Sequence, residues 1–176
     1  MRSFQIARAA VSAALAFAIT FTSARNAIVA LIAVLAYLTS MVAIEIIDAF
    51  KSGDSMLRGT VLRISLSIIA LSTLISASFT RNGDELKLTV INLVILAYGF
   101  TAISFFKMAK APKQSRARTD LLIIALLNVF VLAFYGAQLL KWLSVDDVTA
   151  LGAIAAFGAI QAVLIGISAF DPRTAG

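Results

Sequence analysis

Residues 27–51, "AIVALIAVLAYLTSMVAIEIIDAFK", decide the class of this protein. Within 27–47 the only charge is Glu45, and the run matches the roughly 20 residues that a helix needs to cross about 30 Å of hydrocarbon. We therefore predict an all-α integral membrane bundle of six transmembrane helices, forming one domain over residues 1–176. The other five apolar segments are 9–24, 64–79, 88–106, 121–140 and 148–170.

The amino-acid composition supports a membrane protein and excludes several kinds of catalytic and ligand chemistry. The chain is 61% hydrophobic and 14% charged, whereas a soluble domain carries roughly a quarter of charged residues. It has no Cys and no His, which removes disulfides, thiol chemistry, imidazole ligands and the commonest general base. No phosphate loop, HExxH or GxSxG motif occurs. We expect no enzyme, no cofactor and no metal site.

The formal charge of +6 is distributed unevenly. Eleven of the 15 Lys and Arg residues lie on the side of the two termini and of the second and fourth connections. Cytoplasmic loops collect Lys and Arg, so both termini are predicted to be cytoplasmic, in a cell inner membrane. The basic loop "KMAKAPKQSRAR" (107–118) suits anionic lipid headgroups. No basic run is interleaved with aromatic residues, so nucleic acid is not expected as a partner.

The segments show an internal repeat. Odd-numbered segments align on an arginine near their start, at intervals of 55 residues, and even-numbered segments align on an aromatic residue. This spacing predicts three tandem helical hairpins over about 5–53, 58–112 and 117–173. The aligned residues are Arg8, Arg63 and Arg118, and Tyr37, Tyr98 and Phe157.

With six spans, cytoplasmic ends and helices such as "VTALGAIAAFGAIQAVLIGISAF" (148–170), the chain resembles the HdeD-type acid-resistance membrane proteins. That family has about this length and is built from three similar transmembrane hairpins. The resemblance implies a stress-related membrane protein, and it carries no settled biochemical activity. The first segment also resembles a signal peptide with a cleavage site after Ala24, but we expect it to be retained as a helix.

Small residues recur at four-residue spacing on the first and sixth segments, where they let helix backbones approach closely in lipid. One interpretation is packing of the first helix against the sixth. The other is a docking face for a second copy or for a membrane-protein partner, and such an alanine face resembles that of the substrate-binding components of energy-coupling-factor vitamin transporters. The positions are Ala10, Ala14 and Ala18, and Gly158, Ala162 and Gly166.

Glu45 and Asp48 are the carboxylates that interrupt the 27–51 run. They are three residues apart and so share a helix face near the cytoplasmic surface. A partner would offset the cost of a carboxylate at that depth, and Arg8 or Arg63 lies at the same level. The pair is therefore interpreted as an interfacial ion pair that joins hairpins, with a protonatable gate as the alternative.

Deeper in the membrane the polar residues are amides and hydroxyls. Asn92, Asn128 and Gln161 are predicted either to join helices by hydrogen bonds or to line a small polar cavity. The favoured function is an accessory, scaffolding or stress-related membrane protein that packs against itself or a partner. The alternative is a small solute transporter or channel component, which would require a cavity containing Asn92 or Asn128 and an opening near Glu45.

Overall fold

The computed structural model describes residues 2–21, 27–79, 85–113, 115–141 and 146–170. Six helices account for nearly all of them, and these described residues contain no strand. The all-α prediction is confirmed for the described residues. All six helices are long and apolar enough to cross a membrane, as a multi-pass membrane protein requires. The helices are α1 (Arg2–Phe21), α2 (Ala27–Lys51), α3 (Ser55–Phe79), α4 (Glu85–Lys110), α5 (Arg116–Leu139) and α6 (Asp147–Phe170).

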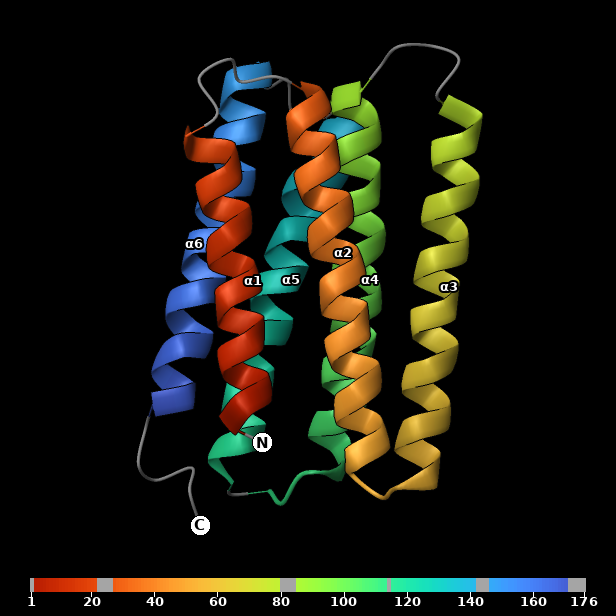
Figure 1. Ribbon diagram of the computed structural model, residues 1–176, viewed down its shortest axis with the longest axis vertical. Coiled ribbons are helices and arrows are strands. Elements are labelled where there is room, and N and C mark those ends of the chain that lie inside the picture. The colour runs from red at the N-terminus through yellow and green to blue at the C-terminus, as the bar shows by residue number, and fades with distance from the viewer. Residues whose placement is uncertain (1, 22–26, 80–84, 114, 142–145, 171–176) are drawn as a thin grey trace.

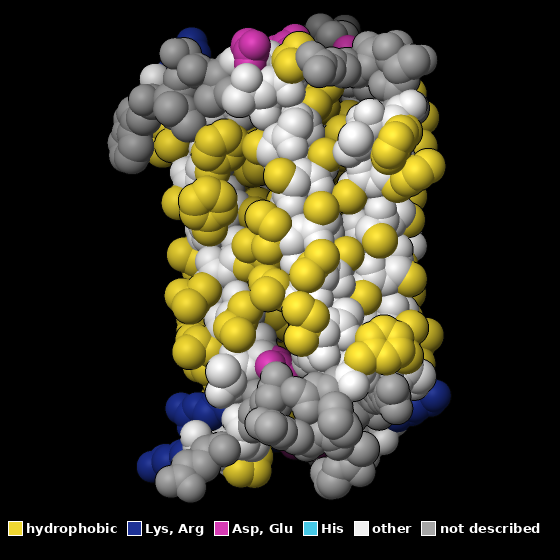
Figure 2. Space-filling view, turned by 90° about the vertical axis from the view of Figure 1, so that its left-hand side faces the viewer, with side chains coloured by type: hydrophobic (Ala, Val, Ile, Leu, Met, Phe, Trp, Pro, Cys, Tyr) yellow, Lys and Arg dark blue, Asp and Glu magenta, His cyan; other side chains and the backbone are white. Residues whose placement is uncertain are grey.

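The helices run alternately up and down in one elongated bundle (Figure 1). The start of α1, the end of α6 and the links α2–α3 and α4–α5 lie together at one end, which we call the near end. The opposite end is the far end. Hydrophobic side chains cover the middle of the face shown in Figure 2, and charged side chains are confined to its two ends. This distribution is the one that a bilayer requires of a lipid-facing surface.

Helix α4 has the largest buried share of the six, and α3 lies at the edge of the bundle against α2 and α4 (Figure 1). Aliphatic side chains such as Val34, Val61, Leu93 and Ile154 are fully buried between the helices. Large apolar side chains such as Phe17 point outward. Packing in lipid thus relies on close contact inside the bundle, because lipid leaves no hydrophobic force between helices.

The packing partners differ from those expected of three equal hairpins. Helices α1 and α2 are neighbours, as are α3 and α4, but α5 and α6 touch each other least of the neighbouring pairs. Instead α6 packs most closely on α1, and α5 on α4. Gly158 explains the first of these contacts: a Cβ there would lie 2.9 Å from the backbone oxygen of Ser12 and 3.2 Å from the backbone nitrogen of Ala16. The tandem repeat stays a prediction.

The α2–α3 link is a tight turn at the near end. Gly53 has φ 74°, a conformation that glycine adopts without steric cost. Asp54 caps α3, because its Oδ1 accepts the N–H groups of Met56 and Leu57, each at 2.9 Å. Its Oδ2 accepts a hydrogen bond from Lys110. The Lys110 ammonium and the backbone N–H groups lower the pKa of Asp54 below its ordinary value.

Candidate functional site

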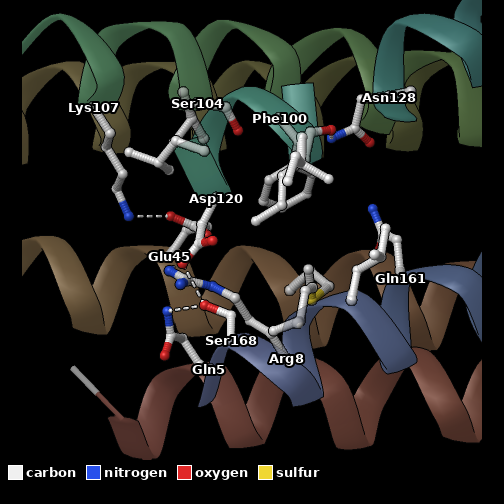
Figure 3. Close-up of a pocket in the computed structure, with 18 of the residues that line it drawn as sticks. Gln5, Arg8, Glu45, Phe100, Ser104, Lys107, Asp120, Asn128, Gln161 and Ser168 are labelled. Carbon is white, nitrogen blue, oxygen red and sulfur yellow. Dashed lines mark hydrogen bonds and ion pairs between the residues drawn. The ribbon is translucent and has the colours of Figure 1, made fainter. Parts of the chain in front are cut away.

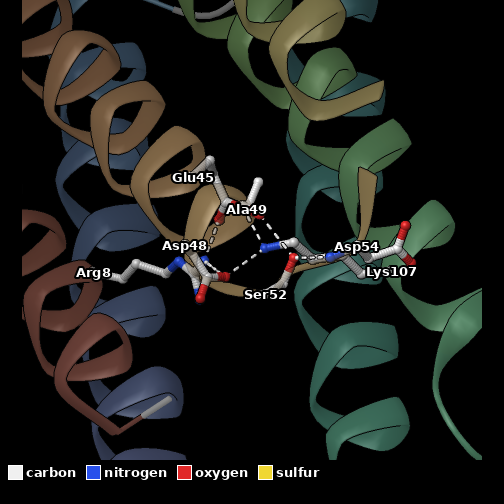
Figure 4. Close-up of polar contacts among 7 residues, drawn as sticks. All are labelled: Arg8, Glu45, Asp48, Ala49, Ser52, Asp54 and Lys107. Atoms are coloured by element: carbon white, nitrogen blue, oxygen red, sulfur yellow. Dashed lines mark hydrogen bonds and ion pairs between the residues drawn. The ribbon is translucent and has the colours of Figure 1, made fainter. Parts of the chain in front are cut away.

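Four charged side chains meet at the near end of the bundle, and we call them the near-end tetrad: Arg8, Glu45, Asp48 and Lys107 (Figure 4). Arg8 Nη2 lies 2.7 Å from Glu45 Oε1 and 3.0 Å from Asp48 Oδ2. Lys107 Nζ lies 2.6 Å from Glu45 Oε2 and 2.7 Å from Asp48 Oδ2. Each carboxylate therefore contacts both cations, and the four charges balance.

The tetrad ties three helices together. Glu45 and Asp48 share one face of α2, Arg8 comes from α1, and Lys107 lies in the last turn of α4. The Glu45 side chain is 7% exposed and that of Lys107 is 13% exposed. Charges at that burial are tolerated in a membrane protein when they pair with one another.

The structure brings Arg8 to the two carboxylates but does not bring Arg63 there. Arg63 is exposed on α3 and forms none of the ion pairs found among the described residues. Its expected place is taken by Lys107, which the sequence analysis treated only as part of a basic loop. The sequence did contain a signal for Lys107. It directly follows the apolar segment 88–106, which places it at the same level in the membrane as Glu45.

A cavity of about 180 Å³ extends into the bundle from the tetrad (Figure 3). Asn128 and Gln161 lie at its deep end. An engineered apolar cavity of about 150 Å³ holds benzene, so this volume suits a small organic molecule. Polar residues at the near end of the lining, besides the tetrad, are Gln5, Ser104, Asp120 and Ser168, and the apolar wall includes Met41, Leu93, Leu96, Ala97, Phe100, Ile103, Phe157 and Ile165.

The cavity reaches the gap between α5 and α6, which contact each other little. Its lining includes Ile123 on α5 and Leu164 on α6, which are both exposed. Hydrogen bonds join the two helices near each end: Ser168 Oγ donates to Asp120 Oδ2 at 2.5 Å, and the Tyr135 hydroxyl donates to the backbone oxygen of Ala150 at 3.0 Å. The helices are therefore linked near both ends of this gap.

At the deep end, two amides have unused hydrogen-bonding groups. The Gln161 side-chain oxygen accepts from Ser12 Oγ at 3.3 Å and from the Tyr37 hydroxyl. Its nitrogen points across the cavity toward Asn128 (Figure 3) and donates to no group in the described part of the chain. Asn128 Nδ2 donates to the backbone oxygen of Ile124 at 2.9 Å, and its Oδ1 accepts nothing from the described residues. A ligand could therefore find both a donor and an acceptor here.

Asn92, the other amide considered for a cavity, lies elsewhere. It is fully buried and does not line this cavity. Ser72 Oγ donates to its Oδ1, and its Nδ2 donates to the backbone oxygen of Leu88 at 2.9 Å and to Ser76 Oγ at 3.5 Å. Asn92 thus joins α3 to α4, which is the other role that the sequence allowed for it.

The predicted small-residue positions of α6 and α1 also differ in their surroundings. Gly158 lies against α1, Ala162 is half-buried, and nothing lies within 4 Å of a Cβ built on Gly166. On α1, however, Ala10 and Ala14 are exposed. Ala18 is half-buried. The surface that α1 offers to α6 therefore includes Ser12 and Ala16, and the alanine series points largely outward.

Comparison with known proteins adds no family to this description. A scan against protein-family models gave no match, and searches of the curated proteins and of the solved structures gave none either. The resemblance to HdeD-type proteins accordingly stays a prediction. Function must be argued from the tetrad and the cavity themselves.

Proposed function

We propose that this protein binds a small solute within the membrane, as a transporter, a channel component or the substrate-binding subunit of a transporter. The observation that supports this is the cavity of about 180 Å³ that extends from the tetrad to Asn128 and Gln161. Such a cavity, apolar in its walls with a few polar groups at its ends, is typical of small-molecule sites. A bundle whose interior was filled by side chains would have favoured a purely structural role.

We further propose that the near end faces the cytoplasm of a cell inner membrane. The excess of Lys and Arg at that end is the asymmetry that orients multi-pass proteins. The same basic residues favour contact with anionic lipid headgroups. In this orientation the tetrad lies at the cytoplasmic end of the cavity.

The tetrad is best explained as a group of ion pairs that holds helices together at this end of the cavity. Glu45 and Asp48 each lie between two cations, so neither is a solitary carboxylate that faces the cavity. A proton relay would need a chain of further ionisable groups toward the far end, and the cavity lining beyond the near end holds only amides, a hydroxyl and apolar groups. The tetrad therefore fixes α1, α2 and α4 around the near end of the cavity.

The cavity can be tested by filling it. Ala97 is buried on α4 and lines the cavity, so Ala97→Phe places a ring in the space. Ala36→Phe, on the exposed face of α2 and outside the lining, adds the same bulk toward lipid. We expect at least one of benzylamine, benzyl alcohol and benzoate to bind the wild type and Ala36→Phe in calorimetric titrations of detergent-solubilised protein, and none to bind Ala97→Phe.

The comparison between variants removes the effect of the compounds on the micelle itself. Bound ligand should also raise the thermal stability of the wild type, since ligands that bind only the folded state stabilise it. Equal responses of the wild type, Ala36→Phe and Ala97→Phe to all three compounds would overturn the proposed binding function.

A second candidate function, an accessory or scaffolding role of the stress-related kind that the HdeD-like resemblance implies, is supported by the outward face of α1. Ala10 and Ala14 are exposed at four-residue spacing, as in faces that let another membrane helix approach closely. We expect Ala14→Leu to abolish self-association or co-purification with a membrane partner. Ala70→Leu on the exposed face of α3 is the matched control. Unchanged association in Ala14→Leu, measured by cross-linking in membranes, would remove this candidate.

A further inference from the structure

We propose that the cavity is selective for a small organic cation, a protonated amine on an apolar body, and that Asp120 is the group that binds its ammonium. This inference rests on the proposed solute-binding function and names the chemical class of the solute. It comes from the balance of charge in the lining, the surroundings of Asp120 and the shape of the apolar wall.

Among the described residues that line the cavity, carboxylates outnumber cationic side chains by one. These residues include three carboxylates and two cations. Arg8 and Lys107 are each engaged by both Glu45 and Asp48, so the tetrad is neutral as a unit. The third carboxylate, Asp120, is left without a counter-ion from the tetrad.

Asp120 has neutral partners. It accepts a hydrogen bond from Ser168 Oγ at 2.5 Å, and Gln5 Nε2 donates to Ser168 Oγ at 3.2 Å. Asp120 forms none of the ion pairs found among the described residues. The chain from Gln5 through Ser168 to Asp120 joins α1, α6 and α5 and holds the carboxylate beside the cavity (Figure 3). It orients Asp120 without neutralising it.

A carboxylate without a counter-ion at the edge of an apolar cavity favours a cation. Ionisable residues within membrane helices pair with one another or mark the path of a substrate or ion. Among the described residues of this lining, Asp120 is the ionisable one that forms no ion pair with another described residue. An anionic solute would add a fourth negative charge to a site that already has one in excess. A protonated amine would supply the missing counter-ion.

The rest of the cavity fits the body of such a solute. Phe100 and Phe157 are in the wall, where an aromatic or aliphatic group can pack and where ring faces favour a nearby cation. Beyond them, the Gln161 nitrogen and Asn128 Oδ1 can hydrogen-bond a polar group at the opposite end of the solute. The structure therefore predicts a short amine of roughly the size of one substituted ring.

The test compares three compounds that share one ring and differ in charge: benzylamine, benzyl alcohol and benzoate. On the wild type we expect benzylamine to bind about tenfold or more tightly than benzyl alcohol, because a hydrogen bond to a charged group contributes more than a neutral one. Benzoate should not bind measurably. Asp120→Asn keeps the size of the side chain, and we expect it to bind benzylamine no more tightly than benzyl alcohol.

Asp54→Asn is the matched control, because Asp54 is also a near-end carboxylate but does not line the cavity. It should preserve the wild-type preference for benzylamine. Equal affinities of the wild type for benzylamine and benzyl alcohol, or a preference for benzoate, would overturn cation selectivity and leave solute binding intact. That comparison needs no variant, so it decides the question even where Asp120→Asn fails to fold. Failure of all three compounds to bind the wild type would instead overturn the proposed function.

Discussion

Two buried asparagines, Asn92 at the contact between α3 and α4 and Asn128 beside the gap between α5 and α6, have opposite surroundings. Asn92 finds Ser72 and Ser76 on the facing helix. Among the described residues, Asn128 bonds only to Ile124 of its own helix, and it faces the cavity. A buried amide in a membrane bundle therefore joins helices where a hydroxyl lies opposite it, and becomes available to a ligand where the facing helix is held away. Helix α6 packs most closely on α1 and much less on α5.

The largest effect is expected from breaking that contact. In Gly158→Leu the new side chain would meet the backbone of Ser12 and Ala16, which cannot move aside as a side chain end can. We expect the free energy of unfolding to fall by about 3 kcal/mol, the upper range for overpacking a close contact. Circular dichroism during titration with sodium dodecyl sulfate measures this change.

Gly166→Leu is the matched control on the same helix. Nothing lies within 4 Å of a Cβ built there, so the side chain has room, and we expect little change in stability. Equal destabilisation by both substitutions would mean that the close approach of α6 to α1 at Gly158 has no special part in stabilising the bundle.

The next effect is expected at the near-end tetrad, which fixes the α1, α2 and α4 side of the cavity. Lys107→Met keeps a long side chain but leaves Glu45 and Asp48 to share Arg8. We expect a loss of about 2 kcal/mol in the free energy of unfolding, less than for a fully buried pair because the site is partly exposed. Lys110→Met, which removes the more exposed pair with Asp54, should change stability much less in the same titration. A larger loss of unfolding free energy in Lys110→Met than in Lys107→Met would show that the tetrad does not hold the three helices together.

The sequence predicted the six helices and the pairing of Glu45 and Asp48 with a near-end cation, because hydrophobic length and the level of charged residues in the membrane are local properties. It could not choose between Arg8 and Arg63. The two arginines occupy equivalent positions of the predicted repeat, yet Arg8 is in the tetrad and Arg63 is exposed. The choice depends on how each helix is rotated in the bundle, and almost every face of these helices is apolar.

The cavity was beyond sequence reasoning for a related reason. Asn92 and Asn128 look alike in the sequence, and only the contacts of α3 and α6 with their neighbours separate them. In the sequence Asp120 only stands directly before the apolar segment 121–140, and no motif singles it out. Its importance arises because α1, α6 and α5 bring Gln5 and Ser168 to it, and these three residues are far apart along the chain.

A smaller effect is expected where α3 meets α4. Asn92→Leu keeps the volume of the side chain but removes its hydrogen bonds with Ser72 and Ser76. Interhelical hydrogen bonds in membrane proteins contribute about 0.6 kcal/mol each on average, so we expect a loss of about 1 kcal/mol in the free energy of unfolding. Benzylamine binding should be unchanged, because Asn92 does not line the cavity. If Asn92→Leu lost benzylamine binding without losing stability, Asn92 would serve the ligand and not the contact between helices.

The smallest effect on stability is expected at Asn128, and it separates the two amides most sharply. Asn128→Leu removes one hydrogen bond within α5 and no described bond to another helix, so the free energy of unfolding should change by less than about 0.5 kcal/mol. A ligand whose polar group reaches the deep end should lose affinity, and 4-(aminomethyl)phenol, which extends benzylamine by a hydroxyl, is suitable for calorimetric titration. We expect it to bind the wild type more tightly than benzylamine does, and to lose that advantage in Asn128→Leu while benzylamine itself binds as before. A stability loss in Asn128→Leu as large as that in Asn92→Leu would show instead that Asn128 joins helices, because a residue that serves only a ligand contributes little to the bundle without one.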